Sequence, residues 1–145
     1  MLSVKDEKFI ALATYYASLS SMYFHHGCVI SLKGNCIAHG FNHERTYSKD
    51  RVIENCVSCH AEMSALRTAL KRCKRSQVNK LKVYVVRISG NSIVNSKPCE
   101  QCYLTLKKYG IKKIIYSQEN DFASSNFKED TFVCMPSSGY INLLQ

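Results

Sequence analysis

The chain has 145 residues, of which 46% are hydrophobic, and a formal net charge of +9 at pH 7. This length supports one domain with a substantial hydrophobic core and is too short for two, so we expect a single domain over residues 1–145. Residues 1–20 carry Lys5, Asp6, Glu7 and Lys8 ahead of a mixed segment. They resemble neither a signal peptide nor a membrane span, so we expect no membrane association.

Eight cysteines occur without an export signal. This combination predicts a reducing, cytoplasmic location, where cysteines serve as metal ligands or core residues and do not form disulfides. The positive charge fits an anionic partner, either a nucleotide phosphate or the backbone of a nucleic acid. We give the charge modest weight, because an AT-rich genome would also produce this lysine-rich composition.

The first part of the chain predicts a helix followed by a hairpin. Apolar residues recur at helical spacing over residues 5–22. Their stripe consists of Phe9, Leu12, Ala13, Tyr16, Leu19 and Tyr23. Two apolar runs, residues 28–32 and 36–38, flank a Gly34-Asn35 turn and predict a β-hairpin. Residues 42–56 are polar and predict a loop.

A second helix is predicted over residues 59–73, with its apolar side chains on one face and Ser58 as a candidate N-cap. Cations crowd its end, and they fit a helix C-terminus better than a nucleic-acid patch. These cations are Lys71, Arg72, Lys74 and Arg75. Residues 81–88 form an apolar run that is typical of a strand covered on both faces.

A third helix should begin with Pro98 at its first position and end near Gly110. Residues 111–116 then predict a strand, so the strand–helix–strand order implies a parallel pair with a right-handed crossover. Ligands gather at the carboxyl ends of such strands, where Cys99 lies. A last strand is predicted near residues 131–134.

Two short motifs carry the chemistry of the chain. His60-Ala61-Glu62 is followed downstream by Pro98-Cys99-Glu100-Gln101-Cys102. One imidazole and two thiolates supply three ligands for Zn²⁺ and leave the fourth tetrahedral position open, as in a catalytic zinc site. We therefore expect His60, Cys99 and Cys102 to bind one zinc ion, with Glu62 as an uncoordinated carboxylate beside it.

Residues two apart on a helix do not face each other. His60 and Glu62 can therefore meet at one site only if their helix points end-on at the metal, and the same geometry serves Cys99 and Cys102. Zinc can lower the pKa of a bound water from roughly 15.7 to about 7. We expect Glu62 to accept the proton of that water and to pass it to the substrate.

His-x-Glu with Pro-Cys-x-x-Cys is the signature of zinc deaminases that act on nucleobases. On these motifs the chain resembles the cytidine and deoxycytidylate deaminase superfamily. The likeness extends to His26-Gly27-Cys28-Val29-Ile30 and to Ile37-Ala38-His39-Gly40-Phe41-Asn42, which are similar to the family's opening hairpin. It covers residues 24–117 and leaves residues 118–145 as a C-terminal extension.

The resemblance implies a three-layer α/β/α fold around a mixed sheet of about five strands. It also implies hydrolytic conversion of cytosine to uracil, with release of ammonia, in a nucleoside or nucleotide. By the same analogy Asn42 would hydrogen-bond the sugar, the backbone of Ala61 would hold the pyrimidine carbonyl, and the chain would form a homo-oligomer. Residues 59–63 and 110–116 most resemble the deoxycytidylate-type branch, which places deoxycytidylate-like substrates first.

Cationic residues near the motifs are candidates for binding the anionic part of a substrate. Arg45, Lys49 and Arg51 lie in the predicted loop and could meet a phosphate, and Lys97 could contact an anionic or carbonyl group. One departure from the free-nucleoside branch is that Cys102 is followed by Tyr103-Leu104 and not by Arg-Gln.

Two other functions and two other kinds of site remain open on the sequence. The chain could deaminate bases of RNA or single-stranded DNA, which would make a nucleic acid its partner. It could be a catalytically silent, zinc-stabilised binding domain, although Glu62 would then serve no purpose. A structural Cys₄ zinc site could form from Cys56, Cys59, Cys99 and Cys102. Cys56-Val57-Ser58-Cys59-His60 also matches a haem-attachment motif, a weaker alternative without an export signal.

Overall fold

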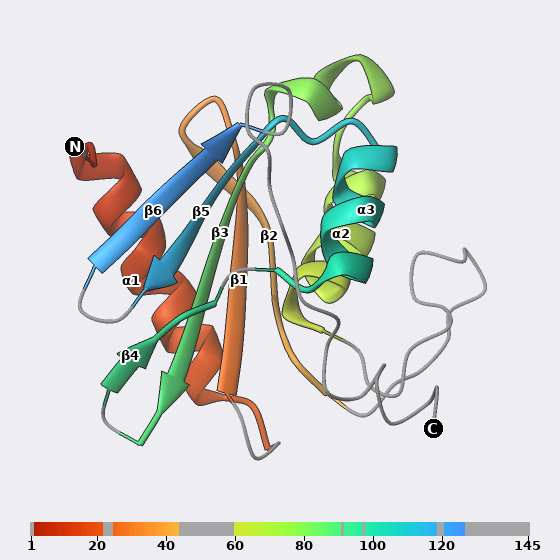
Figure 1. The fold of residues 1–145 in the computed structure, drawn as a ribbon. Helices are drawn as coiled ribbons and strands as arrows, with labels where there is room; N and C mark the ends of the chain where they lie inside the picture. The colour runs from red at the N-terminus through yellow and green to blue at the C-terminus, as the bar shows by residue number, and fades with distance from the viewer. Residues whose placement is uncertain are drawn as a thin grey trace, which may run out of the picture.

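The computed structural model describes residues 2–21, 25–43, 60–90, 92–96, 98–118 and 121–126, the last segment by its backbone only. Its elements form three layers (Figure 1). A sheet lies in the middle, helix α1 (Val4–Ser18) covers one face, and helices α2 (Ala61–Arg72) and α3 (Glu100–Lys108) cover the other. The expected three-layer α/β/α fold is confirmed.

Five strands form the main path of the sheet, in the order β2-β1-β3-β5-β6, and a short strand β4 pairs with β3 beside this path. The strands are β1 (His25–Leu32), β2 (Asn35–Phe41), β3 (Lys82–Ser89), β4 (Ser92–Val94), β5 (Lys113–Gln118) and β6 (Asp121–Asn126). β3 and β5 run parallel, and the other pairs are antiparallel, so the sheet is mixed as expected.

Helix α1 starts with a capping box, in which Ser3 and Asp6 each accept a hydrogen bond from the other's backbone N–H. Phe9 and Ala13 face the sheet as their spacing predicts. The helix ends at Ser18, earlier than predicted. Leu19 therefore lies beyond the last turn and is 46% exposed, so its predicted place in the buried stripe is wrong. Among the described residues, no helix combines the length and the apolar character that crossing a membrane requires.

The predicted hairpin is confirmed by the pairing of β1 with β2. Lys33 and Gly34 form its turn, one residue earlier than the predicted Gly34-Asn35 turn, because Asn35 already pairs with Leu32. Their φ angles are 52° and 82°, and this double positive φ is typical of two-residue hairpin turns. At Gly27, β1 approaches α1 so closely that a Cβ atom would lie 2.0 Å from the Ala13 carbonyl oxygen. Glycine is required there because backbone atoms already fill the space.

Two hydrophobic cores lie on the two faces of the sheet. Val83 and Val85 of β3 pack in the core under α2 and α3, whereas Tyr84 and Val86 pack in the core under α1. The strand is therefore covered on both faces, as its unbroken apolar run predicts. A 3₁₀ helix, η1 (Arg75–Lys80), joins α2 to β3. β4 and β6 were not predicted, and the strand predicted at residues 131–134 lies outside the described residues.

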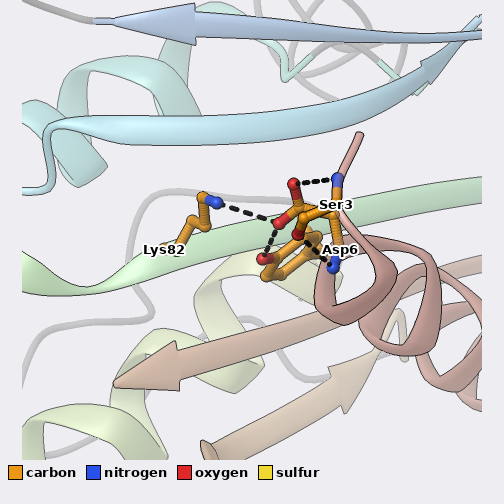
Figure 2. A network of polar contacts seen from close by, with 4 residues as sticks. Ser3, Asp6 and Lys82 are labelled. Atoms are coloured by element: carbon orange, nitrogen blue, oxygen red, sulfur yellow. Dashed lines mark hydrogen bonds and ion pairs between the residues drawn. The ribbon is translucent and has the colours of Figure 1, made fainter. Parts of the chain in front are cut away.

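A buried polar network ties the start of α1 to β3 (Figure 2). Asp6 Oδ1 accepts hydrogen bonds from Lys82 Nζ at 2.9 Å and from Tyr84 Oη at 2.6 Å. Burial alone would raise the pKa of Asp6, but these two hydrogen bonds and the nearby Lys82 charge lower it well below its usual range. Asp6 is therefore an ionised carboxylate held in the folded protein by a cation.

Candidate metal centre

Helix α2 begins at Ala61, and His60 is its N-cap residue, with φ of −78° and ψ of 155°. The Ser64 N–H donates to the His60 carbonyl oxygen at 3.1 Å, the first hydrogen bond of the helix. The predicted start at residue 59 with Ser58 as N-cap is therefore wrong. His60 makes no side-chain capping bond, because its imidazole faces two sulfur atoms from another part of the chain.

Helix α3 repeats this arrangement with Cys99 as its N-cap residue. The Tyr103 N–H donates to the Cys99 carbonyl oxygen at 2.9 Å. Pro98 lies before the N-cap and not at the first helical position, so that prediction is wrong. Proline has no backbone N–H, and neither position needs one for a hydrogen bond within the helix. At the other end Gly110 has φ of 96° and marks the predicted exit.

The two helix starts bring three potential ligands together. His60 Nδ1 lies 3.1 Å from Cys102 Sγ and 3.5 Å from Cys99 Sγ, although the cysteines are 42 and 39 residues away in sequence. All three donor atoms lie within 4.8 Å of one another. Nitrogen and sulfur ligands of a tetrahedral zinc ion lie roughly 3.5–3.8 Å apart, given the usual zinc–ligand distances. The cluster therefore fits one zinc ion.

The pKa shifts of the three cluster residues also indicate a site for a cation. A hydrogen bond from Cys102, and a further one from His60, lower the pKa of Cys99 to about 4. The neighbouring Cys99 in turn raises the pKa of Cys102 well above its usual value, and burial adds to this effect. Burial lowers the pKa of His60, but Cys99 and Glu62 raise it overall. Two adjacent thiolates repel each other, so both sulfurs can ionise at a low free-energy cost only if a positive ion lies between them.

Glu62 is a buried carboxyl group next to this cluster. It is 3% exposed, and its Oε1 atom has no hydrogen-bond partner among the described residues. Burial raises its pKa, and the nearby Cys99 does so too, against the opposing effect of His60. A polar atom that is buried without a partner is costly and often marks a functional group. Oε1 is thus available to a molecule that enters the centre.

Asn42 and Ala61, the two predicted substrate-binding residues, lie on the same side of the sheet as the metal cluster. Asn42 follows β2 and is 8% exposed, and its Oδ1 accepts a hydrogen bond from the His26 N–H at 2.9 Å. The Asn42 N–H donates to the His26 carbonyl oxygen at 3.2 Å. Ala61 is fully buried as the first residue of α2. Their contacts with a substrate stay predictions.

The family resemblance made His26 a candidate for the pocket mouth, with core and surface roles left open, and Arg87 was not assigned a role. They are paired across β1 and β3, and paired residues of antiparallel strands share a face of the sheet. Burial, followed by the charges of Arg87 and His60, lowers the pKa of His26 to about 3. His26 is therefore neutral at physiological pH and lies within the electrostatic reach of the metal cluster.

Other residues from the sequence analysis lie outside the described part of the chain. These residues are Arg45, Lys49, Arg51, Cys56, Ser58, Cys59 and Lys97. The proposed phosphate contacts and the alternative Cys₄ site therefore stay predictions. The described cysteines are free thiols, and they are Cys28, Cys36, Cys73, Cys99 and Cys102. Cys28 is buried, as expected for a core residue, whereas Cys73 is half-buried and Cys36 is exposed, so the expected core role of Cys36 is wrong.

Sequence reasoning also missed Ser96 and Ser117, which are 3% and 0% exposed and whose hydroxyl oxygens lie 2.8 Å apart. Ser96 precedes Cys99 by three residues, but serines near a motif are common. No signal in the sequence pairs it with a serine 21 positions away.

Comparisons with known proteins agree with this geometry. Residues 3–118 match the model of the cytidine and deoxycytidylate deaminase zinc-binding region. No curated protein sequence matches the chain. Among solved structures, the dCMP deaminase of cyanophage S-TIM5, crystallised with dCMP and dUMP, is similar with a TM-score of 0.59 and 20% identity. That match covers 80% of this chain and 82% of the phage protein.

Two bacterial enzymes share the same fold. The cytidine deaminase of Burkholderia pseudomallei has a TM-score of 0.62 and 18% identity, over 90% of this chain and 100% of the other. The cytidine deaminase of Mycobacterium tuberculosis has a TM-score of 0.52 and 14% identity, over 90% of this chain and 99% of the other. The matched zinc-binding region and the His60–Cys99–Cys102 cluster show that the cofactor is one zinc ion. The chain belongs to the cytidine and deoxycytidylate deaminase family.

Proposed function

We propose that the protein is a zinc-dependent hydrolase that converts cytosine to uracil in a nucleoside or nucleotide and releases ammonia. Deoxycytidylate-like substrates are the first candidates. One observation carries the proposal: the buried Glu62 carboxyl group, with Oε1 unpartnered among the described residues, lies beside the only group of three potential metal ligands in the described part of the chain.

His60, through Nδ1, and the sulfurs of Cys99 and Cys102 would hold the zinc ion. Three protein ligands leave one tetrahedral position open, as in catalytic zinc sites. When bound, zinc supplies the Lewis acidity that makes water a nucleophile near neutral pH. The N-termini of α2 and α3 point at the same place, and their dipoles favour the two thiolates.

Glu62 would move the protons of the reaction. Its Oε1 accepts a proton from the attacking water as the oxygen forms a bond to the C4 carbon of the base. The carboxyl group passes this proton to the ring nitrogen N3. It then takes the second proton from the hydroxyl group on C4 and gives it to the exocyclic amine, which leaves as ammonia when the C4–N bond breaks and the C4=O bond forms. Its raised pKa suits both roles, because a group works best as acid and base when its pKa approaches the working pH.

Asn42 and Ala61 would orient the substrate. The His26 N–H holds Asn42 Oδ1, which fixes the side chain, and we assign Asn42 to a hydroxyl group of the sugar. The N–H of Ala61 belongs to the first turn of α2, where backbone donors have no acceptor within the helix. We assign it to the pyrimidine carbonyl oxygen.

Nucleotides are favoured over free nucleosides by two observations. The net charge of +9 suits an anionic substrate, and the similar cyanophage enzyme was crystallised with dCMP and dUMP. We also propose a homo-oligomer, as the family resemblance implies. Oligonucleotides remain the alternative substrate, because the same charge would attract a nucleic acid backbone.

Substitution of Glu62 tests the proposed mechanism. In Glu62→Gln we expect ammonia release to fall by roughly 10²–10⁴-fold or more, because the amide cannot take up the water proton. Zinc content, measured by atomic absorption, should stay near one ion per chain. Glu100→Gln is the matched control, since Glu100 is an exposed residue in the first turn of α3, and it should retain activity. Normal turnover in Glu62→Gln would rule out this mechanism.

The substrate is identified by an ammonia-release screen of cytidine, deoxycytidine, their monophosphates and cytosine-containing oligonucleotides. We expect the highest kcat/KM with a monophosphate. A preference for oligonucleotides would favour the polynucleotide alternative. Zinc binding without ammonia release from any of these compounds would indicate a catalytically silent domain.

A further inference from the structure

Strand β3 pairs with β1 along one edge, and along its other edge the partner changes from β5 to β4. It pairs with β5 from Lys82–Lys113 to Val85–Tyr116, and then with β4 from Arg87–Val94 onward. The chain must leave β4 and reach Cys99 within five residues. The junction between the two pairings therefore decides where Cys99 lies.

Two buried serine hydroxyl groups fill this junction. Ser96 Oγ accepts a hydrogen bond from the Ser117 N–H at 2.7 Å and donates one to the Val85 carbonyl oxygen at 2.8 Å. The Ser96 N–H also donates to the Ser117 carbonyl oxygen at 2.8 Å. Ser96 thus bridges β5 and β3 at the last paired residue of their ladder.

Ser117 makes the complementary bridge between β3 and β4. Its Oγ accepts from the Arg87 N–H at 3.2 Å and donates to the Val94 carbonyl oxygen at 2.6 Å. The two hydroxyl oxygens lie 2.8 Å apart. Each serine therefore satisfies one backbone donor and one backbone acceptor in the interior, where an unpaired polar group would destabilise the fold.

We propose that Ser96 and Ser117 are positioning residues for the metal centre. Their hydroxyl groups hold the end of β4 and the segment before Cys99 against the carboxyl ends of β3 and β5, so that Cys99 Sγ meets His60 Nδ1. The inference rests on the proposed role of Cys99 as a zinc ligand. Without the Ser96 hydroxyl group, the Ser117 N–H and the Val85 C=O lose their shared partner. They can hydrogen-bond to each other only if β3 and β5 move together at this point, and this movement would displace Ser96 and shift Cys99.

The test is zinc affinity, measured by competition with a chromophoric chelator. In Ser96→Ala we expect the zinc dissociation constant to rise roughly 10–100-fold, the usual effect of losing support outside the ligands. Ser31→Ala is the matched control, because Ser31 is 4% exposed and pairs with Lys82 at the opposite end of β3. It should leave the zinc affinity unchanged even where it lowers the Tm of the metal-free protein.

Cobalt provides a second measurement that general destabilisation would not change. Thiolate-to-cobalt charge-transfer absorption reports how many cysteines bind the ion, and we expect it to weaken in Ser96→Ala and to stay normal in Ser31→Ala. If Ser96→Ala does not fold, Ser117→Ala decides, because it keeps the Ser96 bridge to Val85. Weaker zinc binding in that variant supports the proposal, and wild-type zinc affinity in it overturns the proposal.

Cys99→Ser separates this inference from the proposed function. If Cys99→Ser keeps wild-type zinc affinity, the proposed metal centre is wrong. If it loses zinc while Ser96→Ala and Ser117→Ala bind zinc as tightly as the wild type, only the positioning role is wrong. Equal losses of affinity in Ser96→Ala and Ser31→Ala would also overturn it, because the effect would then follow from stability alone.

Discussion

Glu62 and Asp6 are both buried carboxyl groups, one on each face of the sheet, and their surroundings shift their pKa values in opposite directions. Burial raises the pKa of each. Asp6 has Lys82 and Tyr84 as hydrogen-bond donors, so its pKa falls below the usual range, whereas Glu62 faces Cys99 and ends with a raised pKa. The first arrangement stabilises the fold, and the second suits proton transfer.

The lowered pKa of Asp6 predicts a pH-dependent loss of stability. The fold favours the ionised form, so the contribution of Asp6 is complete above its unfolded pKa of about 3.9 and is lost as the pH falls below that value. In Asp6→Asn we expect the free energy of unfolding at pH 7 to fall by about 2 kcal/mol. The difference from the wild type should shrink progressively below about pH 4.

Urea unfolding of the metal-free protein between pH 7 and pH 2 measures this difference without interference from zinc release. Glu7→Gln is the control, because Glu7 is an exposed carboxyl group one residue away. A constant difference between Asp6→Asn and the wild type over the whole pH range would contradict the prediction.

At the scale of elements, the metal centre depends on how closely α2 packs on β2. Gly40 of β2 allows this approach, since a Cβ atom there would lie 2.8 Å from the Ala65 backbone nitrogen and 2.8 Å from Ser64 Cβ. Both residues belong to the turns of α2 that follow His60. The strand therefore sets the distance at which the helix presents its first residues.

Gly40→Ala should move α2 away from the sheet and weaken the site. We expect a loss of about 1–3 kcal/mol in stability, as for other overpacked positions, and a several-fold rise in the zinc dissociation constant. Gly110→Ala is a control at the far end of α3. The positive φ there costs about 1–2 kcal/mol, but among the described residues the added methyl group contacts only Val78, at 3.9 Å. Unchanged zinc affinity in Gly40→Ala would show that the helix position does not control the site.

The sequence predicts the long elements well, because helices α1 and α2 and the β1–β2 hairpin repeat their hydrophobic pattern over many residues. The starts of α2 and α3 were predicted at the wrong residues for a physical reason. Serine and proline are favoured at helix starts, but His60 and Cys99 occupy the N-cap positions, where the proposed metal centre would need them. The functional constraint therefore overrides the local preference.

Features that depend on contacts between distant segments could not be predicted. β4 has three residues, too few for a periodic pattern, and β6 has a largely polar sequence. The ligands His60, Cys99 and Cys102 were identified because their chemistry is specific, although their roles stay predictions. The bridges of Ser96 and Ser117 were missed because they satisfy backbone groups that become neighbours only when β3 changes partner.

For the whole molecule, the two hydrophobic cores lie on either side of the sheet, and the metal centre lies where α2 and α3 begin. The protein should therefore stay folded at 25 °C without zinc, but with a lower Tm. A ligand present at 1,000 times its dissociation constant adds about 4.1 kcal/mol to the stability of the folded state. For a chain of this size, we expect a fall of about 10 °C on chelation.

Differential scanning calorimetry with and without a chelator measures this shift. The double variant Cys99→Ser/Cys102→Ser should have a low Tm that the chelator leaves unchanged. An equal effect of the chelator on the variant and on the wild type would place the stabilising ion elsewhere.

The starts of α2 and α3 are 39 residues apart along the chain, yet their N-cap side chains nearly touch. A metal ion bound between them would be a reversible cross-link between the two helix starts. If a protease cuts the β3–β4 turn, the two fragments should remain one particle while zinc is bound. Removing the metal should then weaken the association of the two fragments, so the ion that we propose for catalysis would also hold the two parts of the chain together.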